Sequence, residues 1–191
     1  MKKTIFFIAM AVLCLFFRVN GQVGGGAAAS RRALLIGDRV PDLVFNNVMN
    51  YKGRVLRLSD FKGKAVLLDF WATWCGSCIA HLPEVMALQR KFGEGLQVIA
   101  VNGSMRDSRE KVEAFVLKQE GTARAFVTPV IYQDAVLRDL FPREVIPHYV
   151  WIGLDGRVKA ITGASAVKEE NVKRLVAGLG LNLPVKGGKD D

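Results

Sequence analysis

The chain has 191 residues, of which 50% are hydrophobic and 24% are charged, and its formal net charge at pH 7 is +9. This length and composition fit one ordinary globular domain that can bury a core. The basic residues are scattered among acids, with no run longer than the pair Arg31 and Arg32, so we expect no nucleic acid-binding surface.

The first 21 residues have the pattern of a secretory signal peptide. Lys2 and Lys3 precede an apolar run from Ile5 to Phe17, and compact residues stand before a possible cleavage site at Gln22. The apolar run is shorter than the about 20 residues that span a bilayer. The alternatives are an uncleaved membrane anchor, cleavage at the small residues Ala27 to Ala29, and a lipid on Cys14.

Export would leave Cys75 and Cys78 as the two cysteines of the mature chain, in a compartment that permits disulfides. We therefore expect a periplasmic or otherwise extracytoplasmic protein, in contact with a membrane only if the leader is uncleaved. Residues 22–34 are rich in Gly and Ala and are expected to form a flexible tether. The domain is expected at residues 35–183, followed by a frayed tail at 184–191.

Short apolar runs and helical patterns alternate along the first half of the domain. Asp107 and Glu110 resemble a capping box for a helix that ends at Gln119. The other elements expected here are a β-hairpin within Leu35–Leu58, a buried strand at Ala65–Trp71, a helix at Cys78–Phe92 that stops at Gly93, and a buried strand at Leu96–Val101.

The second half continues with a short helix, a hairpin and a final helix. The expected elements are a helix at Ala135–Phe141, strands at Tyr149–Ile152 and Arg157–Thr162 around an Asp155-Gly156 turn, and a helix at Lys168–Leu179 that stops at Gly180. A parallel strand-helix-strand unit followed by an antiparallel hairpin predicts an α/β fold. We expect a central mixed sheet with helices on both faces and an N-terminal hairpin extension.

Cys75 and Cys78 follow a buried strand and lie at the first turn of a helix. Unpaired backbone N–H groups and the helix dipole favour a thiolate at this place. Two intervening residues allow the second thiol to attack a mixed disulfide, so the spacing favours reversible exchange. The alternatives are half of a metal site completed by His81 or His148, and an inert bridge that closes a short loop and stabilises weakly.

The segment from Val66 to Cys78 reads VLLDFWATWCGSC and is followed by Pro83. It closely resembles the thioredoxin superfamily, in particular its exported TlpA- and ResA-like thiol-disulfide oxidoreductases. Further similarity lies in GDRVPD at 37–42, DFKGK at 60–64 and the pair Ile146-Pro147. The resemblance covers about residues 35 to 180. It implies a thioredoxin-like fold and disulfide exchange with protein partners, without an organic cofactor or a metal.

The resemblance also implies roles for single residues. Cys75 matches the exposed attacking cysteine, and Cys78 matches the buried resolving one. Pro147 matches a cis-proline that faces the dithiol and presents extended backbone for pairing with a substrate strand. The residues that we expect to contact substrate are Trp74, whose ring could help to dock a partner, Gly76, Ser77 and Ile146.

Asp69 lies in an otherwise apolar strand, where burial of a carboxylate is costly. The resemblance implies that it accepts the proton of Cys78, although it could simply be paired at a strand end. His81 stands where relatives often carry a glutamate, and it could tune the dithiol near neutral pH. His148, next to Pro147, is a second candidate for such tuning. The missing glutamate puts a cytochrome-maturation role in doubt.

No histidine or basic residue lies between the cysteines to stabilise the thiolate of a strong oxidant. We therefore expect a reductase near the reducing end of the range from about −270 to −120 mV. We expect a monomer that is re-reduced by a membrane or periplasmic reductant. A peroxiredoxin is disfavoured, because Ala72 and Leu68 stand where a peroxidase needs Thr or Ser and Pro. A copper or zinc carrier is the rival from another class.

Overall fold

The computed structural model describes residues 32–184 and residue 186. The expected signal peptide, most of the expected tether and most of the expected tail lie outside the described residues. Within the part of the chain that is described, no helix has both the length and the apolar character needed to cross a membrane.

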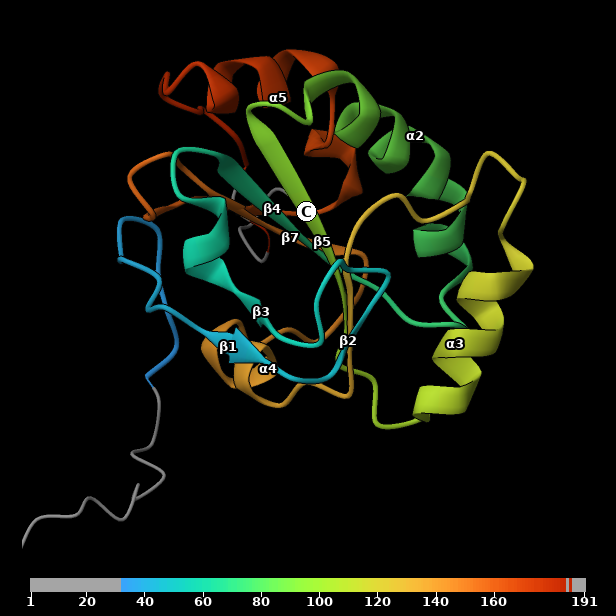
Figure 1. The fold of residues 1–191 in the computed structure, drawn as a ribbon. Helices are drawn as coiled ribbons and strands as arrows, with labels where there is room; N and C mark the ends of the chain where they lie inside the picture. The colour runs from blue at the N-terminus through green and yellow to red at the C-terminus, as the bar shows by residue number, and fades with distance from the viewer. Residues whose placement is uncertain (1–31, 185, 187–191) are drawn as a thin grey trace, which may run out of the picture. The chain divides into compact units, whose positions relative to one another are not determined.

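A six-stranded mixed sheet forms the centre of the fold, in the order β2-β6-β5-β4-β7-β8 (Figure 1). Strands β4, β5 and β6 are parallel, whereas β2, β7 and β8 are added through antiparallel pairings. The strands of this sheet are β2 (Val48–Met49), β4 (Ala65–Phe70), β5 (Leu96–Asn102), β6 (Val130–Tyr132), β7 (His148–Ile152) and β8 (Val158–Thr162). The helices are α2 (Gly76–Phe92), α3 (Arg109–Lys118), α4 (Val136–Leu140) and α5 (Glu169–Val176), with short 3-10 helices η1 (Leu58–Phe61) and η2 (Ala164–Ala166).

The expected α/β fold with a mixed sheet and helices on both faces is confirmed. All six residues of β4 are buried, because both faces of the sheet are covered. One face packs against α2, α3 and α5, and the other packs against α4, η1 and the N-terminal strands. Along β4, Leu67 belongs to the first core and Leu68 to the second, as the alternation of a strand requires.

The N-terminal extension differs from a simple hairpin. Strand β1 (Val44–Phe45) pairs antiparallel with β3 (Leu56–Arg57), as expected, but β2 lies between them in the chain and joins the edge of the main sheet beside β6. Asn50, in the left-handed region with φ 54°, donates from its side chain to the carbonyls of Phe126 and Thr128. The extension is therefore fastened to the main sheet. Strand β6 was not expected, because three residues are too few to show a period.

Two helix ends differ from their expected positions. Helix α2 begins at Gly76, two residues early, because Cys75 acts as its N-cap. Helix α5 ends at Val176, before the expected Leu179. The stop is Gly178, which takes a left-handed φ of 68°, and the N–H of Leu179 donates to the carbonyl of Arg174 at 2.9 Å. The other expected strands and helices are found close to their expected bounds.

Candidate active site

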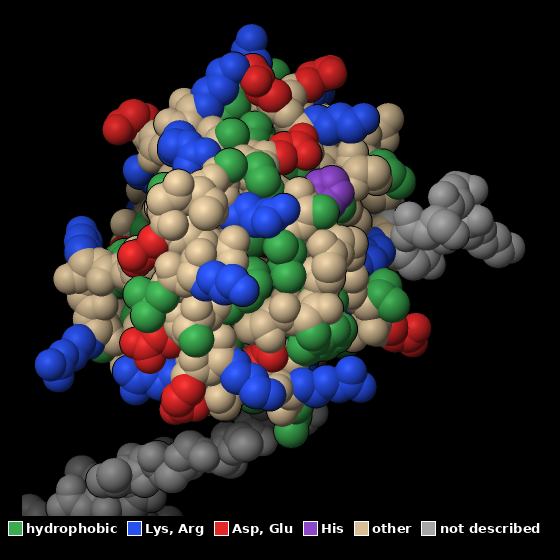
Figure 2. All heavy atoms as spheres, turned by 90° about the vertical axis from the view of Figure 1, so that its right-hand side faces the viewer, with side chains coloured by type: hydrophobic (Ala, Val, Ile, Leu, Met, Phe, Trp, Pro, Cys, Tyr) green, Lys and Arg blue, Asp and Glu red, His purple; other side chains and the backbone are tan. Residues whose placement is uncertain are grey.

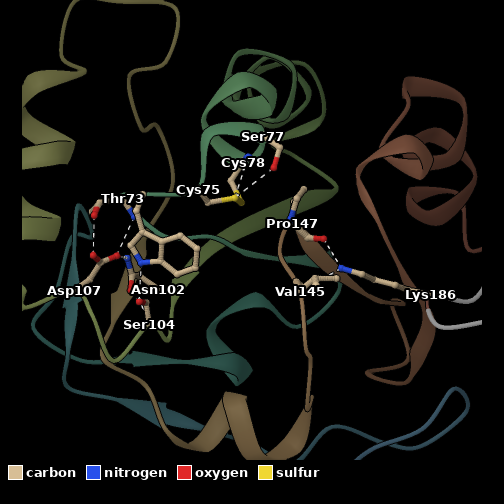
Figure 3. Close-up of a disulfide and its surroundings, with 11 residues drawn as sticks. Thr73, Cys75, Ser77, Cys78, Asn102, Ser104, Asp107, Val145, Pro147 and Lys186 are labelled. Carbon is tan, nitrogen blue, oxygen red and sulfur yellow. Dashed lines mark hydrogen bonds between the residues drawn. A yellow bond between two sulfur atoms is a disulfide. The ribbon is translucent and has the colours of Figure 1, made fainter. Parts of the chain in front are cut away.

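Cys75 and Cys78 form a disulfide at the beginning of α2, just after β4 (Figure 3). The Sγ atom of Cys75 accepts a hydrogen bond from the backbone N–H of Cys78 at 3.2 Å, and the Ser77 Oγ lies 3.5 Å from the same sulfur. The N-cap sulfur therefore faces the first N–H groups and the positive end of the helix dipole. Both stabilise a thiolate once the disulfide is reduced.

The expected exposure of Cys75 is not found in this oxidised form. Its exposed fraction is 5%, against 2% for Cys78, so the order is as expected but both cysteines are buried. The reason is that the Cys75 sulfur is bonded to Cys78 and that Pro147 lies beside the disulfide (Figure 3). Gly76 and Ser77 are exposed, so a partner can reach the turn between the cysteines.

The peptide bond between Ile146 and Pro147 is cis, as the resemblance implied. Lys186 holds this loop from the C-terminal side, because its Nζ donates to the carbonyls of Val145 at 2.9 Å and Pro147 at 2.5 Å. Val145 is 62% exposed, and Ile146 is partly buried. Pairing of Ile146 with a substrate strand stays a prediction.

Asp69 is buried on β4, with an exposed fraction of 2%. Its position in the strand places it on the sheet face that carries Leu67 and Tyr149, which is also the face covered by the start of α2 and by Cys78. The Oδ1 atom of Asp69 and the Tyr149 hydroxyl have no hydrogen-bond partner among the described residues. Burial raises the pKa of Asp69 to about 7, and the neighbouring Tyr149 hydroxyl offsets part of this rise. Asp69 can therefore change its protonation state near neutral pH.

His148 lies on β7 and pairs with Phe70, so it is on the sheet face opposite to that of Asp69. Its ring meets that of Phe70 edge to face, with centroids 5.4 Å apart, and neither ring nitrogen has a hydrogen-bond partner in the described chain. Burial lowers the pKa of His148 to about 4, and Lys186 and Arg143 add to this effect. The ring is therefore neutral at physiological pH. A role of His148 in tuning the dithiol stays a prediction.

His81 lies on α2 and is partly exposed. Its Nδ1 lies 3.5 Å from the Glu84 Oε2, and both side chains are partly exposed. His81 and Ser77 line a cavity of about 860 Å³ beside Pro147, which His148 also borders. A tuning role for His81 stays a prediction.

Trp74 is 53% exposed beside the dithiol, as a docking residue would be. Its Nε1 donates to the Ser104 Oγ at 3.1 Å, and the guanidinium carbon of Arg106 lies 5.3 Å from the ring centroid. These two contacts come from the loop between β5 and α3. They orient the indole ring rather than leaving it free on the surface.

The most heavily bonded side chain near the site is Asp107, which sequence reasoning placed in a helix cap. That capping-box prediction is wrong: Ser108 is the N-cap of α3, and Asp107 is buried and accepts bonds from the Thr73 N–H (2.9 Å), the Thr73 Oγ1 (2.7 Å) and the Asn102 Nδ2 (2.8 Å). Asn102 in turn accepts from the Ser104 N–H at 3.1 Å. Thr73, Trp74, Ser104, Asn102 and Asp107 thus form a closed ring of contacts, part of which is labelled in Figure 3.

No signal in the sequence set Asp107 apart as a partner of Thr73, because 34 positions separate them.

Metal ligation was the alternative use of the cysteines. Among residues 32–184 and 186, no group of three or more His, Cys, Asp or Glu side chains is arranged to hold a metal ion.

Comparison with known proteins matches residues 36–140 to the AhpC/TSA family. The chain belongs to the AhpC/TSA family. Two curated relatives of the chain are the thiol-disulfide oxidoreductase ResA of Geobacillus kaustophilus and the thioredoxin-like protein YneN of Bacillus subtilis. The first is 31% identical over 76% of this chain and 79% of the relative, and the second is 40% identical over 41% of this chain and 45% of the relative.

Solved structures support a thioredoxin-like fold. A crystal structure from Chlorobium tepidum, described as a thiol:disulfide interchange protein DsbE, is 30% identical to the chain and has a TM-score of 0.62. The match covers 78% of this chain and all of the other. A second structure, a thioredoxin-like protein in the oxidised form, has a TM-score of 0.61 at 22% identity and supports the fold alone.

Proposed function

We propose that this protein is an exported thiol-disulfide oxidoreductase that reduces disulfides in protein partners. Thiol-disulfide oxidoreductase activity follows from the relatives and from the two cysteines. The observation that carries the proposal is the Cys75–Cys78 disulfide at the N-terminus of α2, with Pro147 beside it and a titratable Asp69 on the sheet face that the start of α2 covers.

In the reductive direction, the Cys75 thiolate attacks one sulfur of the partner's disulfide. A bond forms between Cys75 and the partner, the partner's own S–S bond breaks, and its second sulfur leaves as a thiolate. Cys78 then loses its proton to Asp69 and attacks the Cys75 sulfur. The Cys75–Cys78 disulfide forms, the partner's other sulfur leaves as a thiolate, and two electrons have passed to the partner. Its two thiolates take up protons from Asp69 and from solvent.

The reaction so written needs neither a metal nor an organic cofactor. Re-reduction of the Cys75–Cys78 disulfide requires an upstream dithiol, which we place at the membrane or in the periplasm. We expect the protein to act as a monomer. Anaerobic titration with copper and zinc tests the rival carrier function: tight stoichiometric binding without turnover of insulin disulfides would favour the carrier.

The two cysteines can be distinguished by substitution. Cys75→Ser should abolish reduction of insulin disulfides, because no attacking thiolate is left. Cys78→Ser should still attack and should stay bound to the partner, because nothing resolves the mixed disulfide. Mass spectrometry of the trapped adducts would identify the partners. Equal activity of wild type and Cys75→Ser would exclude the mechanism.

The direction of electron flow has its own test. Redox titration against glutathione or dithiothreitol should give a potential near the reducing end of the range from about −270 to −120 mV. A value near −120 mV would make the protein an oxidant. Export is tested by sequencing the N-terminus of the protein recovered from the extracytoplasmic fraction, which should begin at Gln22.

A further inference from the structure

An exposed surface of mixed apolar and basic character lies beside the dithiol. We call it the Trp–Arg rim and define it as Trp74, Met105, Arg106 and Arg138. Trp74 is 53% exposed and Met105 is 86% exposed, which is unusual for side chains of this size and polarity. Figure 2 shows one face of the molecule, on which Lys and Arg side chains lie among exposed hydrophobic ones.

The four side chains of the rim form two contacting pairs. The Arg106 guanidinium lies 5.3 Å from the centroid of the Trp74 ring, and the Arg138 Nη1 lies 3.1 Å from the Met105 Sδ. Met105 and Arg106 are adjacent in the chain, and Trp74 precedes Cys75. The rim therefore consists of two contacting pairs, Trp74 with Arg106 and Met105 with Arg138, which the backbone joins at residues 105 and 106.

Hydrogen bonds hold Trp74 and the residue before it in place. The Trp74 Nε1 is bonded to Ser104, and Thr73, one residue before Trp74, is bonded twice to the buried Asp107. A surface that is ordered before binding loses less conformational entropy when a partner arrives. Rigid aromatic and arginine side chains are the types that contribute most to interfaces.

The positive charge of the rim is only partly balanced within the described residues. Arg106 has no ion pair there, and Arg138 meets only the exposed Asp139, at 3.7 Å. The carboxylate nearest to Arg106 in sequence, Asp107, is buried and bonded to Thr73 and Asn102.

We propose that the Trp–Arg rim selects partner proteins in which Asp or Glu residues, together with an apolar side chain, flank the disulfide to be reduced. The proposal rests on the proposed function and specifies its substrate class. Trp74 and Met105 receive the apolar side chain, and Arg106 and Arg138 attract the acidic ones. Because charges at the edge of an interface act mainly on the association rate, the selection appears in kcat/KM and weakens with salt.

The test uses three disulfide-containing peptides that differ only in their flanking residues, which are acidic, uncharged or basic. Reduced protein is mixed with each peptide in a stopped-flow instrument. At low ionic strength the acidic peptide should react about tenfold faster than the basic one, and about 0.5 M salt should remove most of the difference. Arg106→Glu should lower the rate with the acidic peptide about fivefold or more, and Arg106→Gln should have an intermediate effect.

A matched control and a neutral reference separate the possible failures. Arg90→Glu makes the same charge change near the other end of α2, on an exposed residue, and should leave the peptide preference unchanged. Bis(2-hydroxyethyl) disulfide carries no charge, so Arg106→Glu should not alter its reaction rate. Equal rates with acidic and basic peptides, or equal effects of Arg90→Glu and Arg106→Glu, would overturn the rim proposal alone. No reaction with any disulfide, the neutral one included, would overturn the proposed function and the rim proposal together.

Discussion

Two carboxyl groups are buried to the same extent near the dithiol, yet their surroundings are opposite. Asp107 and Asp69 each have an exposed fraction of 2%. Asp107 accepts three hydrogen bonds, from two groups of Thr73 and from Asn102. Asp69 has an oxygen without a partner among the described residues, and burial raises its pKa to about 7.

The difference separates a residue that holds the site from a residue that can act in it. A buried carboxylate with three donors is fixed in one arrangement, and here it fastens the loop that carries Trp74 and Cys75. Burial with few hydrogen-bond donors destabilises the charged form of a carboxyl group. Its pKa therefore rises, and the group gains and releases a proton near neutral pH. Burial does not distinguish Asp107 from Asp69, but their hydrogen-bond partners do.

The largest expected effect comes from removing the well-bonded carboxyl. Asp107→Ala leaves the donors of Thr73 and Asn102 unsatisfied in a buried place, and we expect a loss of about 3–5 kcal/mol in the free energy of unfolding. Denaturant unfolding of the oxidised protein measures this loss. A change below about 1 kcal/mol would show that Asp107 does not anchor the loop.

The second effect concerns the poorly bonded carboxyl. Asp69→Asn should slow the attack of Cys78 on a mixed disulfide by about 100-fold at pH 7, because general acid-base catalysis contributes about that much. Rapid mixing of reduced protein with a chromogenic disulfide, followed by quantification of the mixed disulfide, isolates this step. The first attack by Cys75 serves as the internal control and should change little. If both steps slowed equally, Asp69 would not act on Cys78.

The pH dependence of stability sharpens the same contrast. The pKa of Asp69 is raised from 3.8 to about 7 on folding, so the folded protein holds this proton more tightly than the unfolded chain does. The stability from this group is therefore complete below about pH 4 and is lost as the pH rises towards 7 and above. Between pH 5 and pH 8 the loss amounts to on the order of 2–3 kcal/mol. Asp69→Asn should remove this loss. If the free energy of unfolding of the variant depended on pH as in the wild type, Asp69 would not be the origin of the loss.

The smallest effect tests one bond of the Asp107 group. Thr73→Val removes the hydroxyl donor but keeps the backbone N–H that also reaches Asp107. We expect a loss of about 1–2 kcal/mol in the free energy of unfolding, less than for Asp107→Ala. Thr73→Ser keeps the hydroxyl and should lie closer to wild type. A larger loss for Thr73→Val than for Asp107→Ala would reverse the order that the contacts imply.

Local patterns predicted much of the fold and the centre of the site. The apolar run at 65–71 and the helical spacing after Cys78 gave β4 and α2 at nearly their observed bounds, because burial on two faces and amphipathic packing leave strong periods. The short strand β6 leaves no period, and the route of β2 to β6 depends on contacts far along the chain. The resemblance supplied Pro147 and Asp69.

Asp107 shows what such patterns miss. An aspartate three positions before a glutamate at the start of a helix fits a capping box, and nothing local distinguishes that use from the observed one. Thr73 becomes a neighbour of Asp107 only when β4 and β5 lie side by side in the sheet. The low exposure of Cys75 also depends on a distant segment, the loop that holds Pro147.

The most direct test of this mechanism is the rate at which Cys75 of the reduced protein reacts with iodoacetamide at pH 7, followed by mass spectrometry of the labelled peptide. If the start of α2 stabilises its thiolate, Cys75 should react at least about tenfold faster than free cysteine, and faster than Cys78. A Cys75 that reacts no faster than free cysteine, or more slowly than Cys78, would contradict its assignment as the attacking group.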